Sequence, residues 1–365
     1  MVFKMAESNT KKGLAIAIIA LAVATCILAA ALAVVIAVYP RGDVYSHPEL
    51  EAKVVANNGI QTSSKGTTWK TVFGSVTRED MEYGELRYTV FLPSDYDESK
   101  EYPILLYLHG GSIGYLRTPG ATPWSRDLKT YADVIAENIK DCIIFAPQAP
   151  GRPAELKMQG NSYWSGLPSG KVATTVTDAS ESSPYLRAAE QLLESYIKNG
   201  ISYGDNAYRI DRSRVYLAGH SMGAIGAYTA LRDCPNVFAA AIVGAGIGDP
   251  ETVDKWKNTY AHIIHGRYDN TIHYTATEEM QKALTENSKV EIIPLDREHS
   301  IKPYMYTKEQ FAWMAEKDFD DVTAPYNAAI IALSVTTSVA GAFLAVLLIK
   351  RKKNTVNTAE ISADA

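Results

Sequence analysis

The sequence predicts an α/β domain with a mostly parallel sheet covered by helices on both faces. Two observations carry this prediction: short apolar strand-type runs alternate with helical patterns, and a Gly-x-Ser-x-Gly motif lies between a strand and a helix. A third observation concerns the ends of the chain, where two long apolar runs enclose this domain. The sequence therefore predicts a folded domain between two membrane-spanning helices.

The N-terminal part predicts a tail, a helix and a stalk in succession. Residues 1–12 form a short polar tail, and residues 13–39 are apolar over more than the roughly 20 residues that span a bilayer. Cleavage by signal peptidase stays an open alternative, because the run is rich in alanine. Residues 40–82 are polar, and we expect them to form a stalk followed by an edge strand near residues 69–73.

Residues 83–322 are long enough to form one α/β domain with a full core. Alternating apolar side chains predict a half-buried strand at 85–92. Continuous apolar runs predict further strands at 104–108, 214–218, 261–266 and 290–295. Helical patterns predict helices at 125–139, 184–198, 224–231, 275–284 and 307–317.

The most informative stretch is Gly219-His220-Ser221-Met222-Gly223, because it joins the strand at 214–218 to the helix at 224–231. Strand, Gly-x-Ser-x-Gly and helix form a nucleophile elbow, in which small flanking residues allow a strained turn. A serine hydroxyl is a poor nucleophile near neutral pH unless a base and an orienting acid are present.

The chain supplies both groups in the order serine, acid, histidine. Asp269 follows the strand at 261–266, and His299 follows the strand at 290–295. The ends of parallel strands meet at one edge of a sheet, which is where Ser221 is expected. We therefore expect Ser221 as nucleophile, His299 as general base and Asp269 as the group that fixes the tautomer of the histidine.

Other side chains compete less well for these roles. We expect His220 to point away from the serine, and His262 and His265 to be structural histidines of a core strand. His273 follows the acid loop too closely to reach the serine, whereas Asp296 stays open as a substitute for Asp269.

The strand at 104–108 ends in His109-Gly110-Gly111-Ser112. Backbone N–H groups of Gly110 and Gly111, together with that of Met222, could hold a tetrahedral oxyanion. A simple turn at the end of a strand is the alternative interpretation.

The segment 149–181 has no periodicity and is rich in proline and glycine, which predicts a long functional loop over the site. A packed aromatic anchor in this loop would have the same sequence pattern as a pocket wall. The residues predicted to line a substrate pocket are Ser112, Tyr163, Trp164 and His220.

These motifs resemble those of α/β-hydrolases, in the bacterial branch of feruloyl esterases, polyhydroxyalkanoate depolymerases and prolyl-oligopeptidase-like peptidases. The resemblance covers about residues 86–317 and includes 209–219, Ala146-Pro147-Gln148 with Trp164, and 265–269. It implies hydrolysis through an acyl-enzyme. The chain departs from the family in Ala224, where a second glycine is common, and in Ser112, where many relatives have a third.

The second apolar run, residues 328–349, is followed by the basic tail 350–365. Basic residues flanking transmembrane helices favour the cytoplasmic side. Because basic residues also occur in the tail 1–12, both termini are predicted inside the cell and the domain outside, as in a cell-membrane protein with two spans. Removal of the C-terminal run as a sorting tail is the less favoured alternative.

Charge and cysteines limit the partners. The chain carries a formal net charge of −5, and its tails hold seven basic residues against three acidic ones, so the domain carries about −9. This charge argues against nucleic acid as a partner. Cys142 and Cys234 could pair only if their ends of the sheet meet. No paired-cysteine metal motif occurs, and the proposed chemistry requires no cofactor.

The sequence thus predicts a membrane-anchored serine hydrolase that acts on small-molecule or polymeric carboxylic esters. Peptide bonds are the second substrate class, and acyl transfer to an acceptor other than water would use the same residues. A non-catalytic binding protein on the same scaffold is the alternative of a different class. The substrate and the oligomeric state stay open.

Overall fold

The computed structural model describes residues 2–38, 55–81, 84–151, 164, 182–286 and 288–363. The chain divides into two units, one formed by residues 41–321 and the other by residues 1–40 with 322–365. Each unit is described by itself below.

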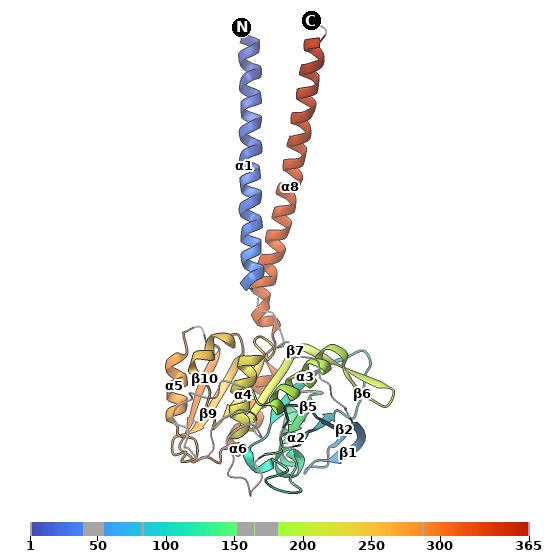
Figure 1. Ribbon diagram of the computed structural model, residues 1–365, viewed down its shortest axis with the longest axis vertical. Helices are drawn as coiled ribbons and strands as arrows, with labels where there is room; N and C mark the ends of the chain where they lie inside the picture. Colours follow the sequence, from blue (N-terminus) through green and yellow to red (C-terminus); the bar gives the residue numbers. More distant parts are fainter. Residues whose placement is uncertain are drawn as a thin grey trace. The chain divides into compact units, whose positions relative to one another are not determined.

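A twisted sheet forms the centre of the larger unit (Figure 1). In the described residues its strands follow the order β1-β2-β3-β5-β4-β7-β8-β9-β10, with β6 paired to β7. Their bounds are β1 Val55–Thr62, β2 Thr68–Val76, β3 Leu86–Leu92, β4 Glu101–Leu108, β5 Ile143–Gln148, β6 Ile201–Tyr203, β7 Asn206–His220, β8 Ala240–Gly244, β9 Tyr260–Gly266 and β10 Val290–Leu295. Every neighbouring pair from β5 to β10 is parallel, whereas the β1-β2-β3-β5 side is antiparallel.

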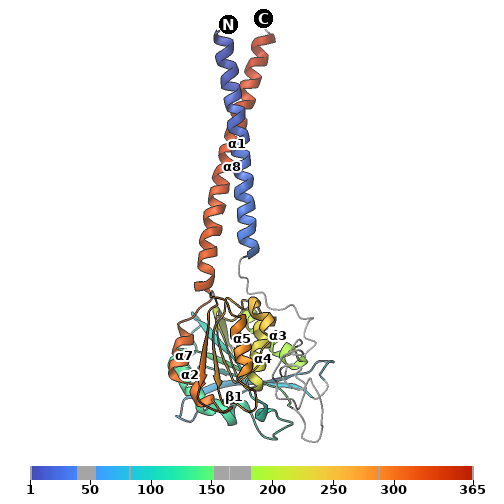
Figure 2. The same cartoon turned by 90° about the vertical axis from the view of Figure 1, so that its left-hand side faces the viewer.

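Helices cover both faces of this sheet, as Figure 2 shows. Helices α2 (Lys129–Asn138) and α7 (Lys308–Ala315) lie on one face, and α3 (Pro184–Asn199), α4 (Met222–Asp233) and α5 (Thr275–Ala283) lie on the other. Helices cover both faces because the strands carry apolar side chains on both sides. In β4, Ile104 and Leu106 belong to the core with α3 and α4, whereas Leu105 and Tyr107 belong to the core with α2 and α7. The predicted α/β class with a mostly parallel sheet is confirmed.

The prediction for residues 40–82 was wrong in one respect. We expected a stalk and a single edge strand near Trp69, but β1 forms the edge and pairs antiparallel with β2 along its whole length. The described side chains of β1 are mostly exposed, so the strand lacks the apolar alternation that would reveal it. The sheet therefore begins well before residue 83. Residues 39–54 lie outside the described residues.

Short helical segments occur at the loops around the sheet. The predicted helix 125–139 begins as a π-helical turn, η2 (Trp124–Leu128), before α2. Two 3₁₀ segments, η1 (Gly111–Ile113) and η3 (Pro250–Lys255), and the short helix α6 (Lys302–Met305) were not predicted. Strands β5, β6 and β8 were also not predicted, although β5 includes the Ala146-Pro147-Gln148 motif.

The smaller unit contains two long helices, α1 (Val2–Val38) and most of α8 (Asp320–Ala363). Within them Gly13–Ile36 and Ala328–Ile349 are long and apolar enough to cross a membrane. These stretches agree with the predicted spans 13–39 and 328–349. Length and composition are the basis of this agreement, and an N-terminal signal sequence would meet the same criteria.

The cysteines of the folded domain do not pair. Cys142 and Cys234 are both buried, and neither forms a disulfide. Cys142 belongs to the core beside α2 and α7, whereas Cys234 belongs to the core beside α3 and α4, so the two thiols lie on opposite faces of the sheet. The disulfide that the sequence left open is absent.

An ion pair between a buried carboxylate and a partly exposed lysine joins α6 to η2. The Asp127 carboxylate, almost fully buried, accepts one hydrogen bond from Tyr107 Oη (2.5 Å) and another from Lys302 Nζ (2.5 Å). Lys302 follows His299 by three residues, so this pair also fixes the loop that carries His299. Three separate elements, β4, η2 and α6, meet at one carboxylate.

Replacing Lys302 with methionine should therefore lower the free energy of unfolding by about 2–3 kcal/mol, because Asp127 stays buried with the tyrosine hydroxyl as its remaining donor. Urea unfolding of the detergent-solubilised chain measures the change. The matched control is the double variant Asp127→Asn/Lys302→Met, which removes both charges and should recover most of the loss. Equal stability of the single and the double variant would contradict a net role for the ion pair.

Candidate active site

Ser221 lies at the junction of β7 and α4 in a backbone conformation that L-residues rarely adopt, with φ 58° and ψ −121°. Two close approaches enforce it. A Cβ atom at Gly223 would lie 1.9 Å from the carbonyl oxygen of Leu108, and one at Gly219 would lie 2.2 Å from the carbonyl oxygen of Gly223. Only glycine fits at either position, so the elbow brings the serine directly beside the end of β4.

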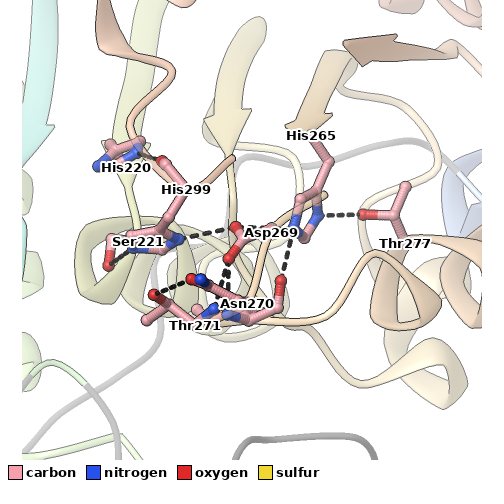
Figure 3. Close-up of polar contacts among 9 residues, drawn as sticks. His220, Ser221, His265, Asp269, Asn270, Thr271, Thr277 and His299 are labelled. Atoms are coloured by element: carbon pink, nitrogen blue, oxygen red, sulfur yellow. Dashed lines mark hydrogen bonds and ion pairs between the residues drawn. The ribbon is translucent and has the colours of Figure 1, made fainter. Parts of the chain in front are cut away.

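Three side chains expected to act together are hydrogen-bonded in series (Figure 3). Ser221 Oγ donates to His299 Nε2 at 2.7 Å, and His299 Nδ1 donates to Asp269 Oδ2 at 2.7 Å. Because a carboxylate only accepts hydrogen bonds, the Nδ1 proton belongs to His299 and Nε2 is the free base. In this arrangement His299 can take the proton of the serine hydroxyl.

Backbone contacts join the loop of Asp269 to the loop of His299. Arg267 N donates to Leu295 O at 2.8 Å, and Tyr268 N donates to Arg297 O at 3.0 Å. The loops after β9 and β10 thus continue the parallel pairing of their strands, which places the acid and the base side by side.

The Asp269 side chain is fully buried and accepts hydrogen bonds on both oxygens. Oδ1 accepts from the backbone N–H of Thr271 (2.8 Å) and of Ile272 (2.9 Å), and Oδ2 lies 2.7 Å from His299 Nδ1 and 3.2 Å from His265 Nε2. Burial alone would raise the pKa of Asp269, but the hydrogen bonds from His265, His299 and the two backbone groups hold it well below its usual value. Asp269 is therefore ionised at neutral pH.

Gly110 and Gly111 lie beside the serine and Met222. A Cβ atom at Gly110 would be 3.9 Å from Ser221 Cβ, and one at Gly111 would be 3.8 Å from Met222 Sδ. Gly111 and Met222 are the first residues of η1 and α4, so their N–H groups have no acceptor within their own helical segments. These donors can hold the negative oxygen of a tetrahedral intermediate.

His109, a buried side chain, holds this glycine turn in place through a hydrogen bond. Its Nε2 accepts from Ala149 N (3.0 Å), so its proton lies on Nδ1, which donates to Gly110 O (2.8 Å). Burial lowers the pKa of His109 to about 4, which keeps the ring neutral. Sequence reasoning missed this role, although a histidine directly before two glycines at a strand end was a visible signal.

The structure corrects the pocket prediction for Trp164. The indole is fully buried in the core, where its Nε1 donates to His109 O (3.0 Å), and it packs closely against Gly226 of α4. Trp164 is thus the packed anchor that the sequence left as the alternative. Ser112 is exposed on η1, and Tyr163 lies outside the described residues.

His220 also differs from its predicted place in a pocket. The side chain points away from the serine hydroxyl, as expected, but it is buried and its Nε2 donates to the backbone oxygen of His299 at 2.9 Å. Burial lowers the pKa of His220 to about 4. His220 therefore connects the elbow strand to the loop of the base.

The other histidines and the alternative acid that the sequence offered lie outside the Ser221–His299–Asp269 series. His262 stacks on Trp313 and contacts Gln310 (2.6 Å), and His273 is exposed beyond the acid loop. Asp296, the alternative acid, is exposed and pairs with Arg267 at 3.3 Å, so it does not replace Asp269. In the described part of the chain no group of three or more His, Cys, Asp or Glu side chains is placed to hold a metal ion.

The chain matches one family model and is similar to several solved structures. A family model, Esterase, described as "Putative esterase", matches residues 82–340. Among solved structures the chain is similar to a thermostable esterase (26% identity, TM-score 0.48), covering 67% of this chain and 63% of the esterase, which is less than two thirds of that protein.

For two further solved structures the similarity covers nearly the whole length of the other protein. An S-formylglutathione hydrolase from Agrobacterium tumefaciens has 17% identity and a TM-score of 0.47, covering 71% of this chain and 99% of its own. A ferulic acid esterase from the anaerobic fungus Anaeromyces mucronatus has 18% identity and a TM-score of 0.42, covering 76% and 95%. Among curated proteins no relative matches.

The two neutral buried histidines predict a stability that depends on pH. The pKa of His109 and of His220 is about 4 in the fold, against about 6.5 in an unfolded chain, so the unfolded state binds more protons between these values. The free energy of unfolding should therefore fall as pH is lowered from 6.5 to 4, by roughly 3 kcal/mol for each ring. Asp269 has a lowered pKa, so its contribution is lost only below about pH 4.

Urea unfolding of the detergent-solubilised chain at several pH values measures this loss. The variant His220→Gln keeps a donor for His299 O but cannot titrate, so its loss should be smaller than that of the wild type by the roughly 3 kcal/mol of one ring. A free energy of unfolding that stays constant between pH 6.5 and 4 would contradict the buried neutral state of both rings.

Proposed function

Because the chain belongs to the esterase family of α/β-hydrolases, we propose that it hydrolyses carboxylic esters with Ser221 as nucleophile, His299 as general base and Asp269 as the acid of the triad. The family match confirms the resemblance predicted from the sequence and the class of serine ester hydrolases. The observation that carries the residue assignment is the uninterrupted series of hydrogen bonds from Ser221 through His299 to Asp269.

In the proposed reaction Ser221 Oγ attacks the ester carbonyl while His299 Nε2 takes the hydroxyl proton. The buried Asp269 carboxylate stabilises the imidazolium that forms, and N–H groups of the Gly110–Gly111 turn and of Met222 receive the oxyanion. The imidazolium then protonates the alcohol as it leaves. A water molecule, activated by the same histidine, releases the acid and restores the serine.

We also propose that the enzyme is anchored to the cell membrane with its catalytic domain, about residues 83–322 with the preceding strands, outside the cell. Two stretches, Gly13–Ile36 and Ala328–Ile349, support this proposal by their length and apolar character. The basic residues in the tails 1–12 and 350–365 favour a cytoplasmic place for both termini. The net charge of about −9 between the tails gives no reason to expect a polyanionic substrate.

The catalytic assignment predicts covalent labelling of Ser221 by a fluorophosphonate probe. Asp269→Asn should reduce kcat on a p-nitrophenyl ester by about 10⁴-fold, because an uncharged partner no longer fixes the tautomer of His299. Peptide mapping identifies the labelled residue and spectrophotometry measures kcat. Ser221→Ala should abolish labelling, whereas Ser112→Ala, a change at an exposed neighbouring serine, should retain it. A wild-type chain that never reacts at Ser221 would refute the assignment.

The membrane topology predicts that protease added to intact cells digests the catalytic domain. An epitope tag after residue 365 should stay protected until the cells are permeabilised, because the basic tail is expected in the cytoplasm. Immunoblotting with a tag antibody and a domain antibody measures both outcomes. Protection of the domain in intact cells, with digestion after permeabilisation, would reverse the proposed orientation.

A further inference from the structure

Asp269 is shared by two histidines. His299 Nδ1 approaches Oδ2 at 2.7 Å and His265 Nε2 approaches the same oxygen at 3.2 Å, as Figure 3 shows. His265 is the next-to-last residue of β9, whereas His299 lies on the loop after β10. One oxygen of the carboxylate is therefore held both from strand β9 and from the loop after β10.

The surroundings of His265 fix its tautomer. Its Nε2 lies 2.9 Å from Ile272 O and 3.2 Å from Asp269 Oδ2, and both atoms are acceptors only. Nε2 must therefore carry a proton that these two oxygens share. In the neutral ring Nδ1 is then an acceptor, and the Thr277 hydroxyl, 2.6 Å away on α5, is placed to donate to it.

All members of this arrangement are closed to water. His265 and Thr277 are at most 1% exposed, and the side chain of Asp269 is fully buried. A donor removed from such a place is not replaced by solvent, so the group it served stays unsatisfied. The opposite tautomer of His265 would turn the lone pair of Nε2 against the carboxylate, which is repulsive at this distance.

We propose that His265 and Thr277 are positioning residues of the esterase, which extend the proposed triad to the series Thr277–His265–Asp269–His299–Ser221. This inference rests on the proposed function. The Thr277 hydroxyl selects the tautomer of His265, and the Nε2–H of His265 stops the carboxylate from rotating away from His299. Neither residue touches substrate, and both act by keeping Oδ2 directed at His299 Nδ1.

Oδ2 of Asp269 needs a donor other than His299 to keep its position. The backbone N–H groups of Thr271 and Ile272 hold Oδ1, and without His265 the other oxygen would be held by His299 alone. His299 changes its own charge during catalysis, so it cannot by itself define where the carboxylate stays. His265 supplies a donor that is independent of that change.

The test compares matched variants of the full-length enzyme in detergent, with kcat and KM for a p-nitrophenyl ester. His265→Gln carries an amide donor at the place of Nε2, whereas His265→Met has similar length and no donor. His265→Met should lower kcat about 10- to 100-fold with KM changed less than twofold, as expected for a displaced catalytic group. His265→Gln should recover most of kcat. Equal loss in both variants, at equal urea midpoints, would overturn the proposal.

Thr277 provides a second, independent pair in case the His265 variants fold poorly. Thr277→Val removes the hydroxyl with little change of shape and should lower kcat, whereas Thr277→Ser keeps the hydroxyl and should retain it. The double variant His265→Met/Thr277→Val should be no slower than His265→Met alone, because both changes act through one donor. Losses that multiply, or Thr277→Val with wild-type kcat, would overturn the linkage.

Failure of this inference is distinguishable from failure of the proposed function. If the wild-type chain neither reacts with the fluorophosphonate probe nor hydrolyses the ester, the proposed function fails and this inference fails with it. If the wild type does both and His265→Met has the same kcat, the esterase assignment stands and only the positioning role is refuted.

Discussion

The site depends on a carboxylate that is removed from water. An ionised Asp269 in the interior is stable only because four donors compensate for the lost hydration: two backbone N–H groups and the two histidines on Oδ2. That requirement shapes the surrounding chain. The loop after β9 must turn back on itself at Thr271 and Ile272, and it must lie against the loop after β10, where Tyr268 N meets Arg297 O. The parallel pairing of β9 and β10 makes both conditions possible.

Buried neutral histidines perform a second task around the serine. His109 holds the glycine turn through Gly110 O, and His220 holds the base loop through His299 O. Each ring connects segments that are far apart in the sequence, and each has its protonation state set by burial. A lysine or arginine could make similar contacts, but it would bring a permanent charge beside His299, which becomes cationic in the proposed reaction. Neutral rings give the same geometry without that repulsion.

The sequence was sufficient for the parts of the site that follow local rules. The elbow at Ser221 has a strict glycine pattern, and Asp269 and His299 could be located because strand ends in a parallel sheet share one edge. The sequence was insufficient where the packing of distant residues decides how a side chain is oriented. Trp164 and His220 were expected in a pocket, but whether a side chain turns to the core depends on neighbours such as Gly226 and His299, which lie far away in the sequence. Strand β1 was missed because an exposed edge strand has no apolar alternation.

The distribution of these contacts explains how one helix far from the serine belongs to the site. Helix α5 covers the face of the sheet near β9, and its buried Thr277 places a hydroxyl against His265. A displacement of α5 would therefore reach the serine through hydrogen bonds alone: first the tautomer of His265, then the direction of Asp269, then the ring of His299. The first two steps join groups that are closed to water, so solvent cannot replace a contact that is lost there. Strand β9, which carries His265, is itself held between β8 and β10.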